Sequence, residues 1–246
     1  MTYCLGIRVK KGLVAVADTR ITSGSETTTG KKVFVHKYGQ YPIFIMTSGL
    51  RSVRDKVITY FNEILEETSG FDKMYKAVNA LGQQIKRVAN EDRDALSHSG
   101  IIFNIYTIVG GQMPGDEGPK LYLLYPEGNW IEVGEGSPFM IIGNSGYGKP
   151  VLQRTVNYNS SLEFALKTGI LSFDSTRVSA NDVGYPIDVL IFSTETMELT
   201  EHRFYESDLQ EITGFWANKL KAAVNSIPDD LVNKILNKES IFSESD

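Results

Sequence analysis

Residues 2–20 read TYCLGIRVKKGLVAVADTR, two apolar runs joined by the basic pair Lys10 and Lys11. The runs at residues 5–9 and 13–18 are rich in aliphatic and β-branched side chains and are bounded by polar residues. Runs of this length and composition are typical of β-strands. We therefore expect the chain to open with an antiparallel hairpin.

The register of this hairpin depends on its loop. If the loop has three residues and ends at Gly12, which would supply the positive φ that such loops favour, opposed residue numbers sum to 22. Thr2 then faces Arg20, and Asp18 is a diagonal neighbour of Thr2 on the same face of the sheet. A two-residue loop would place Asp18 on the other face.

Thr2 is preceded only by Met1, whose removal we expect because the second residue is small. Thr2 would then carry a hydroxyl nucleophile and a free α-amino base on one residue. An α-amino group has an unperturbed pKa of about 7.7–8.0, which suits a general base near neutral pH. A nearby lysine would lower the pKa of this hydroxyl and amine system, and Lys31 or Lys32 could supply it. Asp18 could instead be a charge at a strand end that meets water, and solvated hairpin charges are the commoner interpretation of Lys31 and Lys32.

Composition excludes several other classes of function. The chain has 246 residues, 41% of them hydrophobic, and a formal net charge of -5, so it lacks the basic footprint of a nucleic-acid or membrane-surface protein. Its single cysteine cannot form an internal disulfide, and its three histidines lack metal-ligand spacing. We therefore expect a cytoplasmic protein without a metal, a cofactor or a membrane segment.

Hydrophobic periodicity divides the rest of the chain into blocks of strands and pairs of helices. Further strands are expected at residues 33–35, 43–46, 101–109, 121–125, 130–133, 139–142, 187–193 and 203–205. Helices are expected over residues 53–65, 74–88, 147–157, 160–177 and 209–224. Grouped helix pairs between antiparallel hairpins predict an α+β fold with two stacked sheets between outer helix layers. We expect one domain over residues 1–226 and a tail at 227–246 that is loose or forms an interface.

The spacing of polar residues in the first fifty positions resembles the opening of a proteasome β-type subunit, an N-terminal-nucleophile hydrolase. The matching residues are Thr2, Gly12, Asp18-Thr19-Arg20, Lys31-Lys32-Val33 and the strand at 43–47 leading into Ser48-Gly49. This resemblance implies a four-layer αββα sandwich. It also implies that Thr2, Asp18 and Lys32 form the catalytic group, supported by Arg20, and that the Gly49 N–H stabilises the oxyanion. Lys32 is chosen over Lys31 because Val33 and Phe34 follow it.

Two later motifs depart from the family pattern. Gly143-Asn144-Ser145-Gly146 stands where the family carries Gly-Ser-Gly, so Ser145 could replace the expected serine, or Asn144 could bind the amine itself. The family's Asp-x-x-Ser has no clear counterpart. Ser179, Asn181 and Asp182 are the candidates, and Ser179 is taken into the predicted site.

The Thr-Tyr-Cys opening, Gly-Tyr-Gly-Lys-Pro at residues 146–150 and Gly-Tyr-Pro-Ile-Asp at 184–188 most resemble the bacterial proteasome homologues called Anbu. This resemblance implies a homo-oligomer, as a ring or an open or helical ring, that hydrolyses peptides or other amides. The sequence indicates neither an ATP-dependent unfoldase partner nor a particular substrate. A non-catalytic scaffold subunit is the alternative, as is an amide hydrolase or transferase for a non-protein substrate.

Two other readings of the sequence are weaker. Cys4 shares the predicted face with Thr2 and could act as a nucleophile, but a buried cysteine in a strand is more common. The Gly-rich stretch at residues 143–148 could cradle a phosphate, but it lacks the Lys-Ser/Thr of a P-loop.

Overall fold

The computed structural model describes all residues except 1, 24–25, 39–40, 69 and 237–246. The predicted removal of Met1 and the second half of the predicted tail therefore lie outside the described residues. The chain divides into two compact units, residues 1–207 and residues 208–246. Among the described residues, no helix is both long and apolar enough to cross a membrane.

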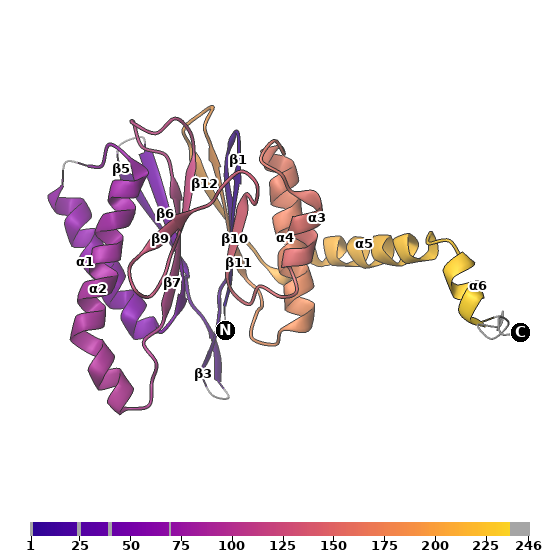
Figure 1. The fold of residues 1–246 in the computed structure, drawn as a ribbon, viewed down its shortest axis with the longest axis horizontal. Coiled ribbons are helices and arrows are strands. Elements are labelled where there is room, and N and C mark those ends of the chain that lie inside the picture. The colour runs from indigo at the N-terminus through magenta and orange to yellow at the C-terminus, as the bar shows by residue number, and fades with distance from the viewer. Residues whose placement is uncertain (1, 24–25, 39–40, 69, 237–246) are drawn as a thin grey trace, which may run out of the picture. The chain divides into compact units, whose positions relative to one another are not determined.

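The first unit contains two five-stranded antiparallel sheets (Figure 1). One sheet has the order β10-β1-β2-β11-β12, formed by Phe139–Gly143, Tyr3–Val9, Gly12–Asp18, Ile187–Ser193 and Leu199–Phe204. The other has the order β5-β6-β7-β8-β9, formed by Val33–Tyr38, Tyr41–Gly49, Ile105–Gly111, Lys120–Leu124 and Trp130–Glu132. A two-stranded ribbon, β3 (Arg20–Ser23) and β4 (Glu26–Thr29), links the two sheets along the chain.

Helix pairs cover the outer faces of the two sheets (Figure 1). Helices α1 (Arg51–Glu67) and α2 (Met74–His98) lie on the β5–β9 side, and α3 (Lys149–Thr155) and α4 (Leu162–Ser179) lie on the β1–β2 side. This arrangement confirms the predicted α+β, four-layer αββα sandwich. The second unit contains most of α5 (Glu206–Asn225) and all of α6 (Asp230–Leu236), a short helix within the predicted tail.

Buried apolar side chains fill the space between the sheets, because every second residue of a strand points from the inner face of its sheet into this space. Ala15 and Ala17 of β2 share one cluster with Phe44 and Met46 of β6, and Cys4 of β1 lies in the same cluster. A second cluster joins the β5–β9 sheet to the apolar faces of α1 and α2. The N-terminal end of β1 therefore lies where the two sheets are packed against each other.

The predicted register of the first hairpin is wrong by one residue. Val9 pairs with Gly12 and Cys4 pairs with Ala17, so opposed numbers sum to 21 and the loop has two residues, Lys10 and Lys11. Gly12 begins β2 and does not end the loop. Its role is close approach, because a Cβ there would collide with the carbonyl oxygen of Phe192 in β11. Asp18 is therefore not a diagonal neighbour of Thr2.

Several element boundaries also differ from the expectation. The sequence does not predict the ribbon β3–β4. Residues 20–29 are mostly polar and β4 is exposed along its length, so there is no alternation of apolar residues to detect. The strand expected from residue 101 begins at Ile105, and α2 continues to His98, ten residues beyond the predicted end.

Candidate functional site

A buried ion pair joins the two sheets near the start of the chain. Lys32 Nζ lies 2.7 Å from Asp18 Oδ1, with 4% of the Lys32 side chain and none of the Asp18 side chain exposed. The same carboxylate oxygen accepts a hydrogen bond from the backbone N–H of Tyr3, at 2.8 Å. Although the register differs from the expectation, the Asp18 carboxylate reaches the residue that follows Thr2.

The environment of Asp18 has opposing effects on its charge. Burial raises the pKa of Asp18, and the Lys32 charge and the hydrogen bonds from Lys32 and Tyr3 counteract this rise. Lys31 has a different position, because its Nζ pairs with Glu201 at 2.6 Å and both side chains are partly exposed. Of the two candidate lysines, the structure brings Lys32 to Asp18.

The backbone of Thr2 is held by the loop after β10. Asn144 donates its backbone N–H to the Thr2 carbonyl at 2.7 Å. Gly143 has a φ of 84°, and a Cβ at this position would collide with the same carbonyl. The Gly143-Asn144 pair therefore permits a backbone contact that a residue with a side chain at position 143 would block.

Thr2 lines a pocket of about 230 Å³ together with Lys32 and Gly49. The remaining lining residues are Arg20, Ile21, Thr22, Thr47, Ser48, Arg51, Arg54 and Asn104. Thr2 directly precedes β1 of one sheet. In the other sheet, Lys32 directly precedes β5 and Gly49 is the last residue of β6. The Thr47 N–H donates to the Lys32 carbonyl at 3.3 Å, which ties the backbone before β5 to β6.

Gly49 stands at the end of β6 with a φ of 129°. A Cβ here would collide with the Asn104 carbonyl oxygen, which accepts the N–H of Leu50 at 2.9 Å. Residue 49 must therefore be glycine, because its φ is positive and because the Asn104 backbone leaves no room for a Cβ. This sharp exit from the strand places residue 49 at the wall of the pocket.

Arg20 holds the segment that follows α4. Its Nη1 donates to the Asn181 carbonyl at 2.7 Å, and its guanidinium packs so closely on Gly184 that a Cβ there would lie 2.7 Å from Arg20 Cζ. Partial burial raises the pKa of Asp182, whereas the positive charge of Lys32 acts to lower it. Ser179 is exposed at the end of α4.

The sequence also singled out Asn144, Ser145 and Cys4. The side chains of Asn144 and Ser145 are half-buried, and Asn144 meets Thr2 through its backbone. Cys4 is fully buried, and burial raises the pKa of its thiol. A buried neutral thiol is a poor nucleophile, so the structure supports a packing role for Cys4.

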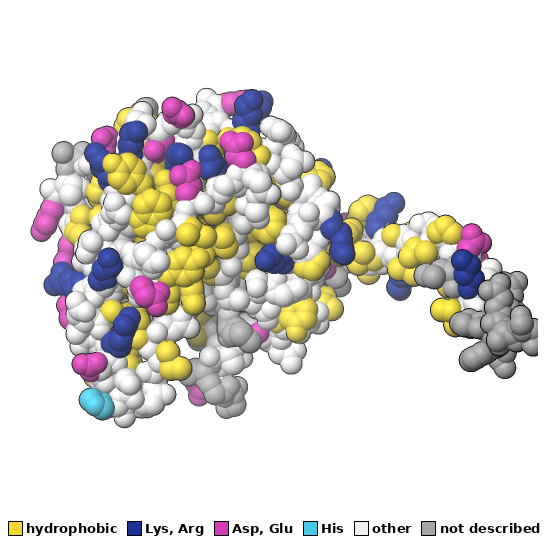
Figure 2. Space-filling view, viewed as in Figure 1, with side chains coloured by type: hydrophobic (Ala, Val, Ile, Leu, Met, Phe, Trp, Pro, Cys, Tyr) yellow, Lys and Arg dark blue, Asp and Glu magenta, His cyan; other side chains and the backbone are white. Residues whose placement is uncertain are grey.

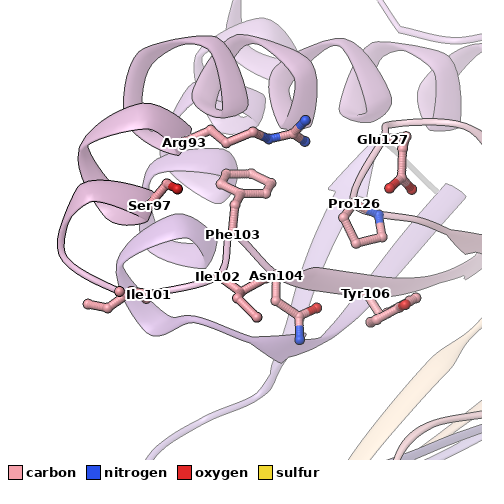
Figure 3. A pocket seen from close by; sticks show the side chains of 10 residues that line it. Arg93, Ser97, Ile101, Ile102, Phe103, Asn104, Tyr106, Pro126 and Glu127 are labelled. Carbon is pink, nitrogen blue, oxygen red and sulfur yellow. The ribbon is translucent and has the colours of Figure 1, made fainter.

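A larger cavity of about 620 Å³ shares Asn104 with the Thr2 pocket (Figure 3). Figure 3 shows Phe103 between Arg93 of α2 and the loop that carries Ile102. The Arg93 guanidinium lies 5.1 Å from the centre of the Phe103 ring. None of the predicted site residues lines this cavity.

Among the residues of the Thr2 pocket that sequence reasoning missed are Arg51, Arg54 and Asn104. A signal for the arginines was available, since both follow within five residues of Gly49 at the start of a predicted helix. Asn104 had no such signal, because its place depends on the pairing of β6 with β7.

Comparisons with known proteins find matches over most of the chain. A family model described as "Proteasome subunit" matches residues 2–192. The "Proteasome subunit beta" of Haloquadratum walsbyi is 26% identical over 213 residues, which cover 83% of this chain and 79% of that protein.

Solved structures of Anbu proteins are similar over most of the chain. The Anbu (Gly-1) mutant from Hyphomicrobium sp. strain MC1 is 32% identical with a TM-score of 0.85, covering 93% of this chain and 98% of that one. Anbu (ancestral beta-subunit) from Yersinia bercovieri is 27% identical with a TM-score of 0.84, covering 92% and 97%. The helical assembly of the Anbu complex from Pseudomonas aeruginosa has a subunit that is 28% identical, with a TM-score of 0.84 and the same coverage.

Proposed function

Because the chain belongs to the proteasome subunit family, and is similar to its Anbu members, we propose that it is a threonine-type amide hydrolase that cuts peptides. Thr2 is the nucleophile once Met1 has been removed. The observation that carries this proposal is the buried Asp18–Lys32 pair, 2.7 Å long, in a site where Thr2, Lys32 and Gly49 share one pocket.

In the proposed reaction, Thr2 Oγ attacks the amide carbonyl and its proton passes to the free α-amine of the same residue. The Gly49 N–H stabilises the oxyanion, a contribution of about 2.7–4 kcal/mol for one donor. The C–N bond breaks as the amine returns the proton to the leaving group. Water then attacks the acyl-enzyme ester and releases Thr2.

Lys32 acts by charge in this scheme. Its ammonium favours the deprotonated forms of the Thr2 hydroxyl and amine, which lowers their pKa. Asp18 fixes the position of that ammonium and, through the Tyr3 N–H, the backbone beside Thr2. We assign Arg20 to positioning, because it binds the 181–184 segment that carries Asp182.

We also propose that the chain works as a cytoplasmic homo-oligomer, in a ring or an open helical ring. On the face shown in Figure 2, hydrophobic side chains gather over the middle of the sandwich and charged side chains lie mainly towards its rim. Exposed apolar surface of this kind is typical of subunit interfaces. The helical assembly of the Pseudomonas aeruginosa relative supports the same proposal.

Intact-mass measurement followed by active-site labelling tests the hydrolase proposal. The purified chain should lack Met1, and a peptide epoxyketone, which requires the hydroxyl and the free amine of an N-terminal residue, should add once. Thr2→Ala should not be labelled. Thr59→Ala, the same change at an exposed position of α1, should be labelled like the wild type.

Retention of Met1, or acetylation of the amine, would remove the base and contradict the proposal. A free Thr2 that gives no adduct would instead favour a scaffold subunit that keeps the fold without turnover.

A further inference from the structure

The charged side chains of the Thr2 pocket share one sign. Arg20, Lys32, Arg51 and Arg54 line it, and among the described residues no Asp or Glu does. The chain as a whole is acidic, with a formal net charge of -5. The positive pocket is therefore a local departure from the overall charge.

Neighbouring carboxylates compensate only part of this charge. Asp18 pairs with Lys32. Asp55 forms ion pairs with two arginines: its Oδ1 lies 2.7 Å from Arg54 Nη2, and its Oδ2 lies 3.5 Å from Arg51 Nε. Two guanidinium groups thus share one carboxylate, which leaves an excess positive charge at this wall.

Arg20, which also lines the pocket, adds to the excess positive charge. Its hydrogen-bond acceptor is a neutral group, the Asn181 carbonyl. A guanidinium that binds a carbonyl keeps its full charge, so it attracts an anion that enters the pocket. The carboxylate of Asp182, one residue beyond this acceptor, is the nearest opposing charge along that segment, and it already lies within the influence of Lys32.

Arg54 is held in place before a substrate arrives. Only 13% of its side chain is exposed, its Nε and Nη2 both donate to Asp55, and its guanidinium lies 5.8 Å from the centre of the Phe34 ring. Arg51 is 68% exposed and can adjust to a ligand. A fixed guanidinium next to an adaptable one can place N–H donors on both oxygens of a carboxylate.

The N-terminal end of α1 adds a weaker positive electrostatic potential to the pocket. Leu50 is its N-cap and provides no side-chain cap, and the first turn has no acidic residue. The positive end of the helix dipole therefore reaches the pocket wall at Arg51 without a compensating carboxylate in that turn.

From these features we propose that the pocket selects peptides with an acidic side chain on the residue whose carbonyl Thr2 attacks. This inference rests on the proposed hydrolase function. The volume of about 230 Å³ suits one side chain, because it lies below the roughly 300–1,000 Å³ of pockets that enclose a whole small ligand. Arg51 and Arg54 bind the carboxylate, and Asp55 competes with it.

Two peptide epoxyketones that differ only in Glu or Gln at the residue bearing the electrophile provide the test. The measured quantity is the ratio of the second-order rates of Thr2 labelling, Glu over Gln. A charge-assisted contact of this kind corresponds to a ratio of about 10 to 100 for the wild type. Arg51→Gln and Arg54→Gln should each lower this ratio, and high salt should lower it as well.

Two further variants sharpen the test. Asp55→Asn removes the competing carboxylate and should raise the Glu/Gln ratio above that of the wild type. Arg87→Gln removes the same charge from an exposed site on α2, where Arg87 pairs with Glu91, and should leave the ratio unchanged. Arg51 and Asp55 are both more than half exposed, so their variants remain informative if Arg54→Gln does not fold.

A ratio near one in the wild type, or a ratio that Arg51→Gln and Asp55→Asn leave unchanged, overturns the acidic preference while the hydrolase proposal stands. Absence of labelling by both epoxyketones, and by a third that carries Leu at the same residue, with Thr2 free, refutes the hydrolase proposal and the preference with it.

Discussion

Replacing Lys32 with methionine isolates the contribution of the buried ion pair. Methionine keeps most of the side-chain volume and removes the charge. The Asp18 carboxylate, fully buried, would then retain only backbone hydrogen bonds such as that from Tyr3. Removing one partner of a buried pair typically costs about 3–5 kcal/mol, because the remaining charge is uncompensated.

The loss of stability should depend on pH. Burial already raises the pKa of Asp18, and removal of Lys32 takes away its largest opposing influence, so the folded-state pKa rises further. The folded state of the variant then holds a proton that the unfolded state releases above a pKa of about 3.9. Between a pH of about 3.9 and the raised folded-state pKa of Asp18, the stability of the variant therefore falls as pH rises, by at most about 1.4 kcal/mol per pH unit. The deficit should be larger at pH 7.5 than at pH 5.

Urea unfolding at these two pH values measures the effect, with Lys31→Met as the matched control. Lys31 pairs with Glu201 in a partly exposed bridge, which is worth about 0–1 kcal/mol. Combining Lys32→Met with Asp18→Asn should recover stability but not labelling of Thr2. Equal losses for the two lysine variants, or a Lys32→Met deficit that grows towards pH 5, would refute this reasoning.

Three further predictions concern the surroundings of the pair. Gly143→Ala should slow labelling of the N-terminal threonine and lower the melting temperature, because its Cβ would displace the threonine carbonyl, whereas Gly146→Ala, with open space around its Cα, should do neither. Iodoacetamide should leave Cys4 unmodified in the native protein and alkylate it in urea, as mass spectrometry can show, because the thiol is buried and its pKa is raised. Asp182→Asn should reduce the rate of labelling more than Ser179→Ala, because the Asp182 carboxylate is influenced by Lys32 and Ser179 is exposed at a helix end.

The sequence predicted the layers of the fold because they follow from local apolar periodicity. The strands around residues 5–9 and 13–18 and the two helix pairs are all present. The register of the first hairpin failed for a non-local reason. Gly12 is required by the backbone of β11, a strand some 180 residues away, and a sequence pattern cannot distinguish this from a glycine that a turn requires.

The same limit applies to the site. The spacing of Thr2, Asp18 and Lys32 can be matched to a family, but the Asp18–Lys32 contact depends on two sheets stacking in one particular alignment. Arg51 and Arg54 read as ordinary charges on the exposed face of a helix. Only the turn at Gly49 brings the start of that helix beside Thr2.

A site divided between two sheets makes its geometry depend on their packing. Thr2 precedes β1 and Asp18 ends β2 in one sheet, whereas Lys32 precedes β5 and Gly49 ends β6 in the other. The apolar cluster between the sheets aligns them but has no directional preference, whereas the Asp18–Lys32 pair is satisfied in one alignment only. A shift of one sheet along the other would leave a buried carboxylate unpaired, at a cost comparable with a large share of the total stability. The ion pair that sets the electrostatics of Thr2 therefore also selects the alignment of the sheets in which the Thr2 pocket exists.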